Sequence, residues 1–256
     1  MSFSEQIVQL GGREARLMRG GSGEPLVFLH GGEGSMSRMT SFLAPLTRDF
    51  DVMAPLHPGF GGTPLPPDFD SVDDLVLHYL DLFDKLKLAR VHLVGLSLGG
   101  WIAAELAALH RERVSKMVLV DAAGIKVEGI ILPNPFMISG EKLAAMLVSD
   151  PALRASLAPK TPEERVARLL DREAAARFVF QRLYDPKLKA RLARVTAPTL
   201  VLWGEKDGLM PLDYGRAYAK AIPGARFSTL DAGHALPLER PAEFAAAVAS
   251  FLKEGK

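Results

Sequence analysis

The pentapeptide Gly95-Leu96-Ser97-Leu98-Gly99 constrains this chain more than any other segment. A short apolar run, residues 91–94, precedes it, and a longer run, residues 101–109, follows it. This order predicts a strand, a one-residue corner and a helix. The two glycines leave room for a tight turn, and Gly-x-Ser-x-Gly in this setting is a nucleophile elbow that raises the serine hydroxyl above the chain. The sequence therefore predicts Ser97 as a nucleophile.

Composition and charge exclude several classes of partner. The chain has 256 residues, no cysteine and a formal net charge of +1, and its basic residues are spread along it. We therefore expect no disulfide, no thiolate metal site and neither a nucleic-acid nor a membrane partner. We also expect neither a metal nor an organic cofactor. The first residues lack a basic segment followed by an apolar one, so a cytoplasmic protein is expected. The sequence does not indicate an oligomeric state.

Short apolar runs with turn residues beside them predict the strands. These strands are Ile7 to Leu10, Ala15 to Met18, Leu26 to Leu29, Val52 to Ala54, Val91 to Val94, Met117 to Val120, Thr199 to Trp203 and Arg226 to Leu230. The first two form a hairpin, and the later ones alternate with helical stretches, which favours an α/β protein with a mostly parallel sheet. A capping box at Ser71 and Asp74 begins a helix that ends near Leu88, and Pro241 lies in the first turn of the last helix.

Residues 125–195 interrupt this rhythm, because a crossover between parallel strands needs only one helix. Three helical pieces are predicted there, Glu141 to Val148, Glu163 to Leu170 and Ala174 to Tyr184. We interpret the segment as an inserted helical lid on a core made of residues 1–124 and 196–256. Most apolar side chains of this segment are predicted to pack within the protein. A few are predicted to line the site, where they would favour a substrate with an apolar acyl or alcohol group. The apolar side chains of the segment include Ile131, Leu132, Phe136, Met137, Met146, Phe178 and Phe180.

A serine nucleophile needs a base and an acid beside it. His234 lies just after the last predicted strand, in a Gly-His context that none of the other five histidines shares. Asp207 lies in the loop after the preceding strand, and the order Ser, Asp, His is the one expected on such a sheet. Asp121 and Glu205 are the rival acids; Asp121 also follows a strand, and Glu205 is expected to be solvated.

Backbone amides are expected to bind the oxyanion. The segment His30-Gly31-Gly32-Glu33-Gly34-Ser35 follows a strand, and its glycines allow the amides to turn inward. The amides of Gly32 and of Leu98, the residue after the nucleophile, are the predicted donors. Glu33 is unusual in such a loop and is predicted to be a solvated carboxylate.

Five motifs together resemble the α/β-hydrolase superfamily, in its lid-bearing branch. They are His30-Gly31-Gly32, His57-Pro58-Gly59-Phe60-Gly61, the elbow with Gly100, Gly204-Glu205-Lys206-Asp207 and Gly233-His234. The resemblance covers nearly the whole length and is weakest in the lid. It implies an eight-stranded, mostly parallel sheet that contains an antiparallel second strand and is flanked by helices.

The predicted activity is hydrolysis of carboxylic esters with apolar groups through an acyl-enzyme on Ser97. Carbon–carbon bond hydrolysis, as in the meta-cleavage hydrolases, stays open, although Glu33-Gly34-Ser35 and Ala235 depart from the usual pattern of those enzymes. A lactonase or a cofactor-free perhydrolase would use the same triad. A ligand receptor on a hydrolase scaffold is the alternative from another class. An aspartate in place of Ser97 would be expected for dehalogenase or epoxide-hydrolase chemistry.

Overall fold

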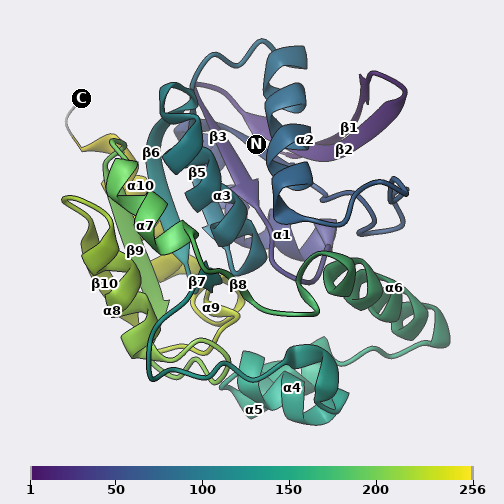
Figure 1. The fold of residues 1–256 in the computed structure, drawn as a ribbon. Helices are drawn as coiled ribbons and strands as arrows, with labels where there is room; N and C mark the ends of the chain where they lie inside the picture. The colour runs from purple at the N-terminus through teal and green to yellow at the C-terminus, as the bar shows by residue number, and fades with distance from the viewer. Residues whose placement is uncertain (1, 255–256) are drawn as a thin grey trace.

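A single eight-stranded sheet organises residues 2–254, which are the residues that the computed structural model describes. The strand order is β1-β2-β4-β3-β5-β6-β9-β10 (Figure 1). The strands are β1 Ser4–Leu10, β2 Arg13–Gly21, β3 Glu24–Leu29, β4 Phe50–Pro55, β5 Val91–Leu96, β6 Val114–Val120, β9 Thr199–Gly204 and β10 Arg226–Leu230. β2 is antiparallel to both β1 and β4, and every other neighbouring pair is parallel. The predicted fold class and each predicted strand are confirmed.

Helices cover both faces of the sheet, so its parallel strands are apolar on both sides. One face packs against α2 Val72–Lys85, α3 Leu98–Leu109, α7 Leu188–Arg191 and α8 Leu212–Ala221. The other face packs against α1 Met36–Leu43, α9 Leu236–Glu239 and α10 Pro241–Lys253. Successive residues of β3 alternate between the two cores, with Val27 and Leu29 in the first and Leu26 and Phe28 in the second. This alternation follows from the period of two in a strand.

The predicted capping box of α2 is confirmed. The Ser71 side chain accepts from the Asp74 amide, and the Asp74 carboxylate accepts from the Ser71 amide at 2.9 Å. Aspartate thus takes the place of the usual glutamate or glutamine at this position.

Tight 3-10 turns extend or connect several elements, at Ala44–Arg48, Arg111–Arg113, Pro135–Met137 and Leu192–Arg194.

The segment between β6 and β9 differs in detail from its prediction. It contains α4 Gly140–Leu147, α5 Pro151–Leu157 and α6 Pro162–Val179, together with a two-stranded sheet of β7 Gly124–Ile125 and β8 Tyr184–Asp185. The two helices predicted over 163–184 are one helix, because Asp171-Arg172-Glu173 contains no helix-breaking residue. This helix ends at Val179, and Tyr184, predicted as helical, begins β8. Helix α5 was not predicted, although Asp150 followed by Pro151 is a clear helix start.

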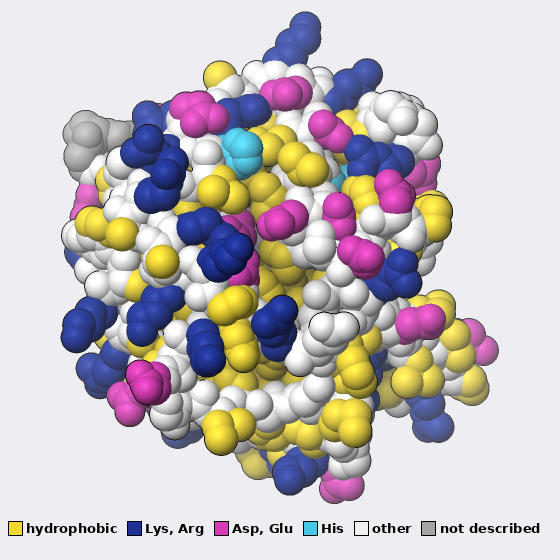
Figure 2. All heavy atoms as spheres, in the orientation of Figure 1, with side chains coloured by type: hydrophobic (Ala, Val, Ile, Leu, Met, Phe, Trp, Pro, Cys, Tyr) yellow, Lys and Arg dark blue, Asp and Glu magenta, His cyan; other side chains and the backbone are white. Residues whose placement is uncertain are grey.

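Helices α4 and α5 lie side by side beyond one end of the sheet, and α6 lies apart from them and protrudes from the body of the protein (Figure 1). The exposed side chains of Val166, Leu169 and Leu170 leave apolar surface on α6. Over the face of the protein shown in Figure 2, positive and negative side chains are intermixed. Ile131 is 95% exposed and Met137 is 75% exposed, so these two residues do not pack as predicted. None of the described helices is both long and apolar enough to span a membrane.

Candidate active site

Ser97 occupies a sharp corner between β5 and α3. Its φ of 54° and ψ of −113° are unusual for a residue other than glycine, and such a conformation costs on the order of 1–3 kcal/mol. Side chains at the flanking glycines would make the turn impossible: a Cβ at Gly95 would lie 2.4 Å from the Gly99 carbonyl oxygen, and a Cβ at Gly99 would lie 2.0 Å from that of Leu29. The Ser97 hydroxyl makes no capping hydrogen bond to α3. The elbow therefore has the geometry that the motif predicts, and the hydroxyl is not used to cap the helix.

Asp207 and His234 form a buried pair at the ends of β9 and β10. Asp207 Oδ2 lies 2.7 Å from His234 Nδ1. Asp207 Oδ1 accepts from the amides of Leu209 and Met210, each at 2.8 Å. These two amides fix the carboxylate, and the carboxylate fixes the imidazole with its hydrogen on Nδ1. Nε2 is then the ring atom that can accept a proton.

The two rival acids have other partners. Asp121, at the end of β6, accepts from the Gly204 amide at 2.7 Å through Oδ1. Burial and the neighbouring Asp207 carboxylate raise the pKa of Asp121 well above its ordinary value. Glu205 accepts from the Thr229 hydroxyl at 2.7 Å in an exposed setting. Of the three carboxyl groups, Asp207 is the one that hydrogen-bonds to His234.

Parallel strands bring the Ser97 corner and the His234 loop to one edge of the sheet. β5, β6, β9 and β10 are consecutive neighbours in the sheet and run in the same direction. The Ser97 amide donates to Val120 at 3.0 Å, and a Cβ on Gly204 would lie 2.3 Å from the Gly233 carbonyl oxygen. No hydrogen bond joins the Ser97 hydroxyl to His234 within the described chain, and such bonds are often long before substrate binds.

The glycine loop after β3 lies against the elbow. A Cβ on Gly31 would lie 3.2 Å from Ser97 Cβ, and Leu98, the other predicted donor residue, is the first residue of α3. A Cβ on Gly32 would lie 3.9 Å from Ala175 Cβ on α6. The loop that carries Gly32 therefore lies between the nucleophile corner and the inserted helices.

His30 and His57, whose rings are in contact, brace the glycine loop. His30 Nε2 accepts from the His57 amide at 2.9 Å, and His57 Nε2 donates to the His30 carbonyl oxygen at 2.7 Å. The Tyr79 hydroxyl hydrogen-bonds to His57 Nδ1. Burial lowers the pKa of His30 to about 4, so the ring is neutral and can accept at Nε2. Both histidines are therefore loop-bracing residues.

Asp171 of α6 is a structural residue that no local sequence pattern identifies. Its two carboxylate oxygens accept from the amides of Gly34 and Gly61, each at 2.8 Å. One side chain thus holds the glycine loop, the turn after β4 and the inserted helix together. Glu33 is half-exposed, as predicted, but pairs with Arg38 at 3.0 Å and with Arg168 of α6 at 3.6 Å.

Glu239 of α9 plays a similar part on the histidine side. Its Oε1 accepts from the Gly233 amide at 3.0 Å and from the Ser149 amide at 2.8 Å, and its Oε2 accepts from the Ser149 hydroxyl. The amide of Ala235 donates to Leu147 at 2.8 Å. The residues on both sides of His234 are therefore fastened to the α4–α5 connection.

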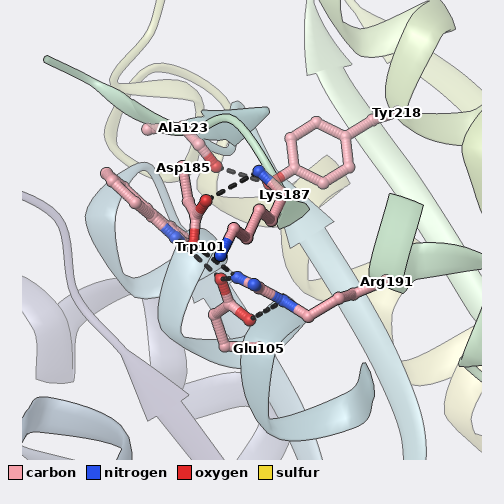
Figure 3. A network of polar contacts seen from close by, with 7 residues as sticks. All are labelled: Trp101, Glu105, Ala123, Asp185, Lys187, Arg191 and Tyr218. Atoms are coloured by element: carbon pink, nitrogen blue, oxygen red, sulfur yellow. Dashed lines mark hydrogen bonds and ion pairs between the residues drawn. The ribbon is translucent and has the colours of Figure 1, made fainter. Parts of the chain in front are cut away.

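A further buried carboxylate anchors the helix that begins at the elbow. Glu105 of α3 accepts from Arg191, at 3.0 Å from Nε, and from the Trp101 indole at 3.4 Å (Figure 3). Arg191 also pairs with Asp185 of β8 at 2.6 Å. Desolvation raises the pKa of Glu105, although the guanidinium beside it opposes the shift. This network joins α3 to the chain where it returns from the inserted helices.

Comparisons with known proteins show the family of this chain. A sequence model of the Alpha/beta hydrolase family matches residues 26–247. The chain belongs to this family. It is 32% identical to a protein of Pseudomonas savastanoi pv. phaseolicola named "Putative carbamate hydrolase RutD", over 89% of this chain and 93% of that one. It is 30% identical to the 2-hydroxymuconate semialdehyde hydrolase of Pseudomonas sp. strain CF600, over 98% and 94%.

This chain is also similar to a solved structure of a serine hydrolase involved in carbazole degradation. The two chains superpose with a TM-score of 0.77 at 26% identity, over 98% of this chain and 99% of the other. The fold and the membership in a family of hydrolases are thereby established. Within residues 2–254, no group of three histidine or carboxylate side chains is placed to hold a metal ion.

Proposed function

We propose that this hydrolase cleaves carboxylic esters with apolar groups through an acyl-enzyme on Ser97. The observation that carries the proposal is the Asp207–His234 hydrogen bond of 2.7 Å, formed at the same sheet edge as the strained Ser97 corner. The carbazole-pathway relative named a serine hydrolase supports the same assignment.

In the proposed mechanism, Ser97 Oγ attacks the ester carbonyl while His234 Nε2 takes its proton. Asp207 keeps the other ring hydrogen on Nδ1 and stabilises the imidazolium that forms. The amides of Gly32 and Leu98 bind the oxyanion, and one such donor contributes on the order of 3 kcal/mol to the transition state. His234 then protonates the leaving alcohol, and water repeats the sequence on the acyl-enzyme.

A carbon–carbon bond hydrolase is the second candidate, because the relative from strain CF600 is named a 2-hydroxymuconate semialdehyde hydrolase. Substrates of that kind carry a carboxylate and would need a cation in the site. Two arginines near the glycine loop, Arg38 and Arg168, are engaged with Glu33. This pairing favours an uncharged ester over an anionic dienoate.

The test is a substrate panel assayed with the wild type and with Ser97→Ala. The panel contains p-nitrophenyl esters of increasing acyl length, an aryl carbamate, a lactone and a 2-hydroxy-6-oxo-dienoate. We expect fast ester turnover that peaks at one acyl length and is lost in Ser97→Ala. Faster cleavage of the dienoate than of any ester would favour the second candidate. Stoichiometric labelling by a fluorophosphonate with almost no turnover of the panel would favour the ligand receptor.

A further inference from the structure

We propose that Asp121 is a positioning residue for the triad: it is a neutral carboxylic acid that donates a hydrogen bond from Oδ2 to the Asp207 carboxylate. The kinetic part of this inference rests on the proposed function. The protonation state itself concerns the folded protein and can be tested without turnover.

The first observation is that the Asp121 side chain is bonded to Gly204, to which the Asp207 backbone is also bonded. Asp121 Oδ1 accepts from the Gly204 amide at 2.7 Å, and the Asp207 amide donates to the Gly204 carbonyl oxygen at 3.2 Å. The two aspartates are thus attached to opposite ends of one glycine. Asp121 follows the last residue of β6 and has a positive φ of 44°.

The second observation is that Oδ2 of Asp121 lacks a donor. The residue is fully buried, and among residues 2–254 no N–H or O–H group donates to this atom. Asp207 is a neighbour of Asp121, because its charge and a hydrogen bond between the two side chains both raise the pKa of Asp121. Two carboxylates in that arrangement would repel each other, whereas a protonated Oδ2 would satisfy both side chains.

The third observation is the charge around the pair. Two further buried carboxyl groups act on Asp121: Asp207 from the loop after β9 and Glu239 from α9. Burial, Asp207 and Glu239 all raise the pKa of Asp121, and only the Gly204 amide opposes them. Asp207 has His234 and two amides as partners, so the proton belongs on Asp121.

The expected role is to hold Asp207 and to spread its charge. Oδ1 of Asp207 already accepts from two amides, and the acid of Asp121 supplies a further donor. Without this donor, Asp207 carries more negative charge toward His234 and holds the imidazolium proton more strongly. The acid limb of the pH–rate profile would then move to higher pH.

The experiment compares Asp121→Ala, Asp121→Asn and the exposed control Asp213→Asn. Asp121→Ala is expected to lower kcat by roughly tenfold or more with little change in KM, and to move the acid limb to higher pH. Asp121→Asn keeps both an acceptor for Gly204 and a donor for Asp207. It should therefore recover kcat to within about threefold of the wild type, with the acid limb unmoved.

An infrared difference spectrum between wild type and Asp121→Asn near pH 7 reads the protonation state directly. A carboxylic-acid C=O band, lost in Asp121→Asn and kept in Asp213→Asn, is expected. Absence of that band, or an acid limb that moves to lower pH in Asp121→Asn, would overturn the proposal, because both indicate an ionised Asp121. If the wild type turns over no substrate, the proposed function fails, and the infrared band still decides the state of Asp121.

Discussion

His234 Nδ1 and Asp207 Oδ2 lie 2.7 Å apart and are both buried. Two loops separated by β10 form this pair, and each loop follows a strand of the same parallel sheet. The pairing selects one tautomer of the imidazole and directs the other nitrogen away from the carboxylate. The predictions below follow from this pair and from the contacts that hold its loops in place.

Asp207→Asn should keep the fold but favour the wrong tautomer of His234. The amide side chain donates where the carboxylate accepts, so Nε2 would carry the hydrogen. We expect kcat for the best ester to fall by about 10³-fold or more, with KM changed little. Steady-state kinetics and circular dichroism check this, with Asp213→Asn as the exposed control. Near-normal kcat would show that Asp207 is not the acid.

Asp171→Ala should loosen the glycine loop. The buried amide of Gly34 and the part-buried amide of Gly61 lose their acceptor, and an amide left unsatisfied in a buried setting costs about 1–3 kcal/mol. We expect a lower free energy of unfolding and a lower kcat, because the loop that carries Gly32 is no longer held to α6. Denaturant unfolding and ester kinetics measure both. Glu173→Ala, an exposed change on the same helix, should alter neither; equal effects of the two variants would contradict the assignment.

His78→Phe should reduce the loss of stability in acid. Both ring nitrogens of His78 are buried without a hydrogen-bond partner among the described residues, and burial lowers its pKa to about 4. The unfolded chain, with an ordinary histidine pKa of 6.5, binds the proton first as the pH falls. The titration of His78 therefore leaves the free energy of unfolding unchanged above pH 6.5 and lowers it progressively between pH 6.5 and pH 4.

Between pH 7 and pH 5, His78 should cost the wild type about 2 kcal/mol. Phenylalanine preserves the edge-to-face contacts with Phe69 and Tyr79 and removes this contribution. Urea unfolding at the two pH values gives the comparison. His30, whose pKa is also lowered to about 4, remains in the variant, so part of the acid sensitivity should persist. An unchanged pH dependence in His78→Phe would contradict the prediction.

Arg191→Ala should destabilise the protein because it leaves Glu105 buried without its main partner. The Glu105 side chain is 1% exposed, and breaking such a pair typically costs about 3 kcal/mol or more. The double variant Glu105→Leu with Arg191→Leu should recover much of the loss, since it buries no charge. Thermal unfolding of the single and double variants tests the coupling. Additive losses would show that the two side chains are not coupled.

Local patterns predicted the sheet well. Apolar runs such as 91–94 and 199–203 are buried strands. The corner at Ser97 follows from Gly95 and Gly99, because the turn has no room for a side chain at either position. The pair of Asp207 and His234 was predicted from chain order and position after strands, because parallel strands place such loops at one edge. In these cases, the determining contacts lie within a few residues or follow from strand direction.

Long-range contacts were beyond this reasoning. Asp171 and Glu239 were not predicted, because their partners Gly34 and Ser149 lie far from them in the sequence. The division of the 163–184 segment into two helices was wrong, since it followed apolar spacing where helix propensity is continuous. Which inserted residues reach the substrate depends on packing that no local pattern encodes, so the lid function of residues 125–195 stays a prediction.

The central claim is that Ser97 forms the acyl-enzyme, and covalent trapping tests it most directly. The wild type and the variants Ser97→Ala and Ser228→Ala are incubated with a fluorophosphonate, and the modified peptide is located by mass spectrometry. We expect one label per chain, on Ser97, in the wild type and in Ser228→Ala. Ser97→Ala should take up no label and should lose ester turnover by several orders of magnitude while remaining folded. A label on another residue, or near-normal turnover in folded Ser97→Ala, would contradict the account.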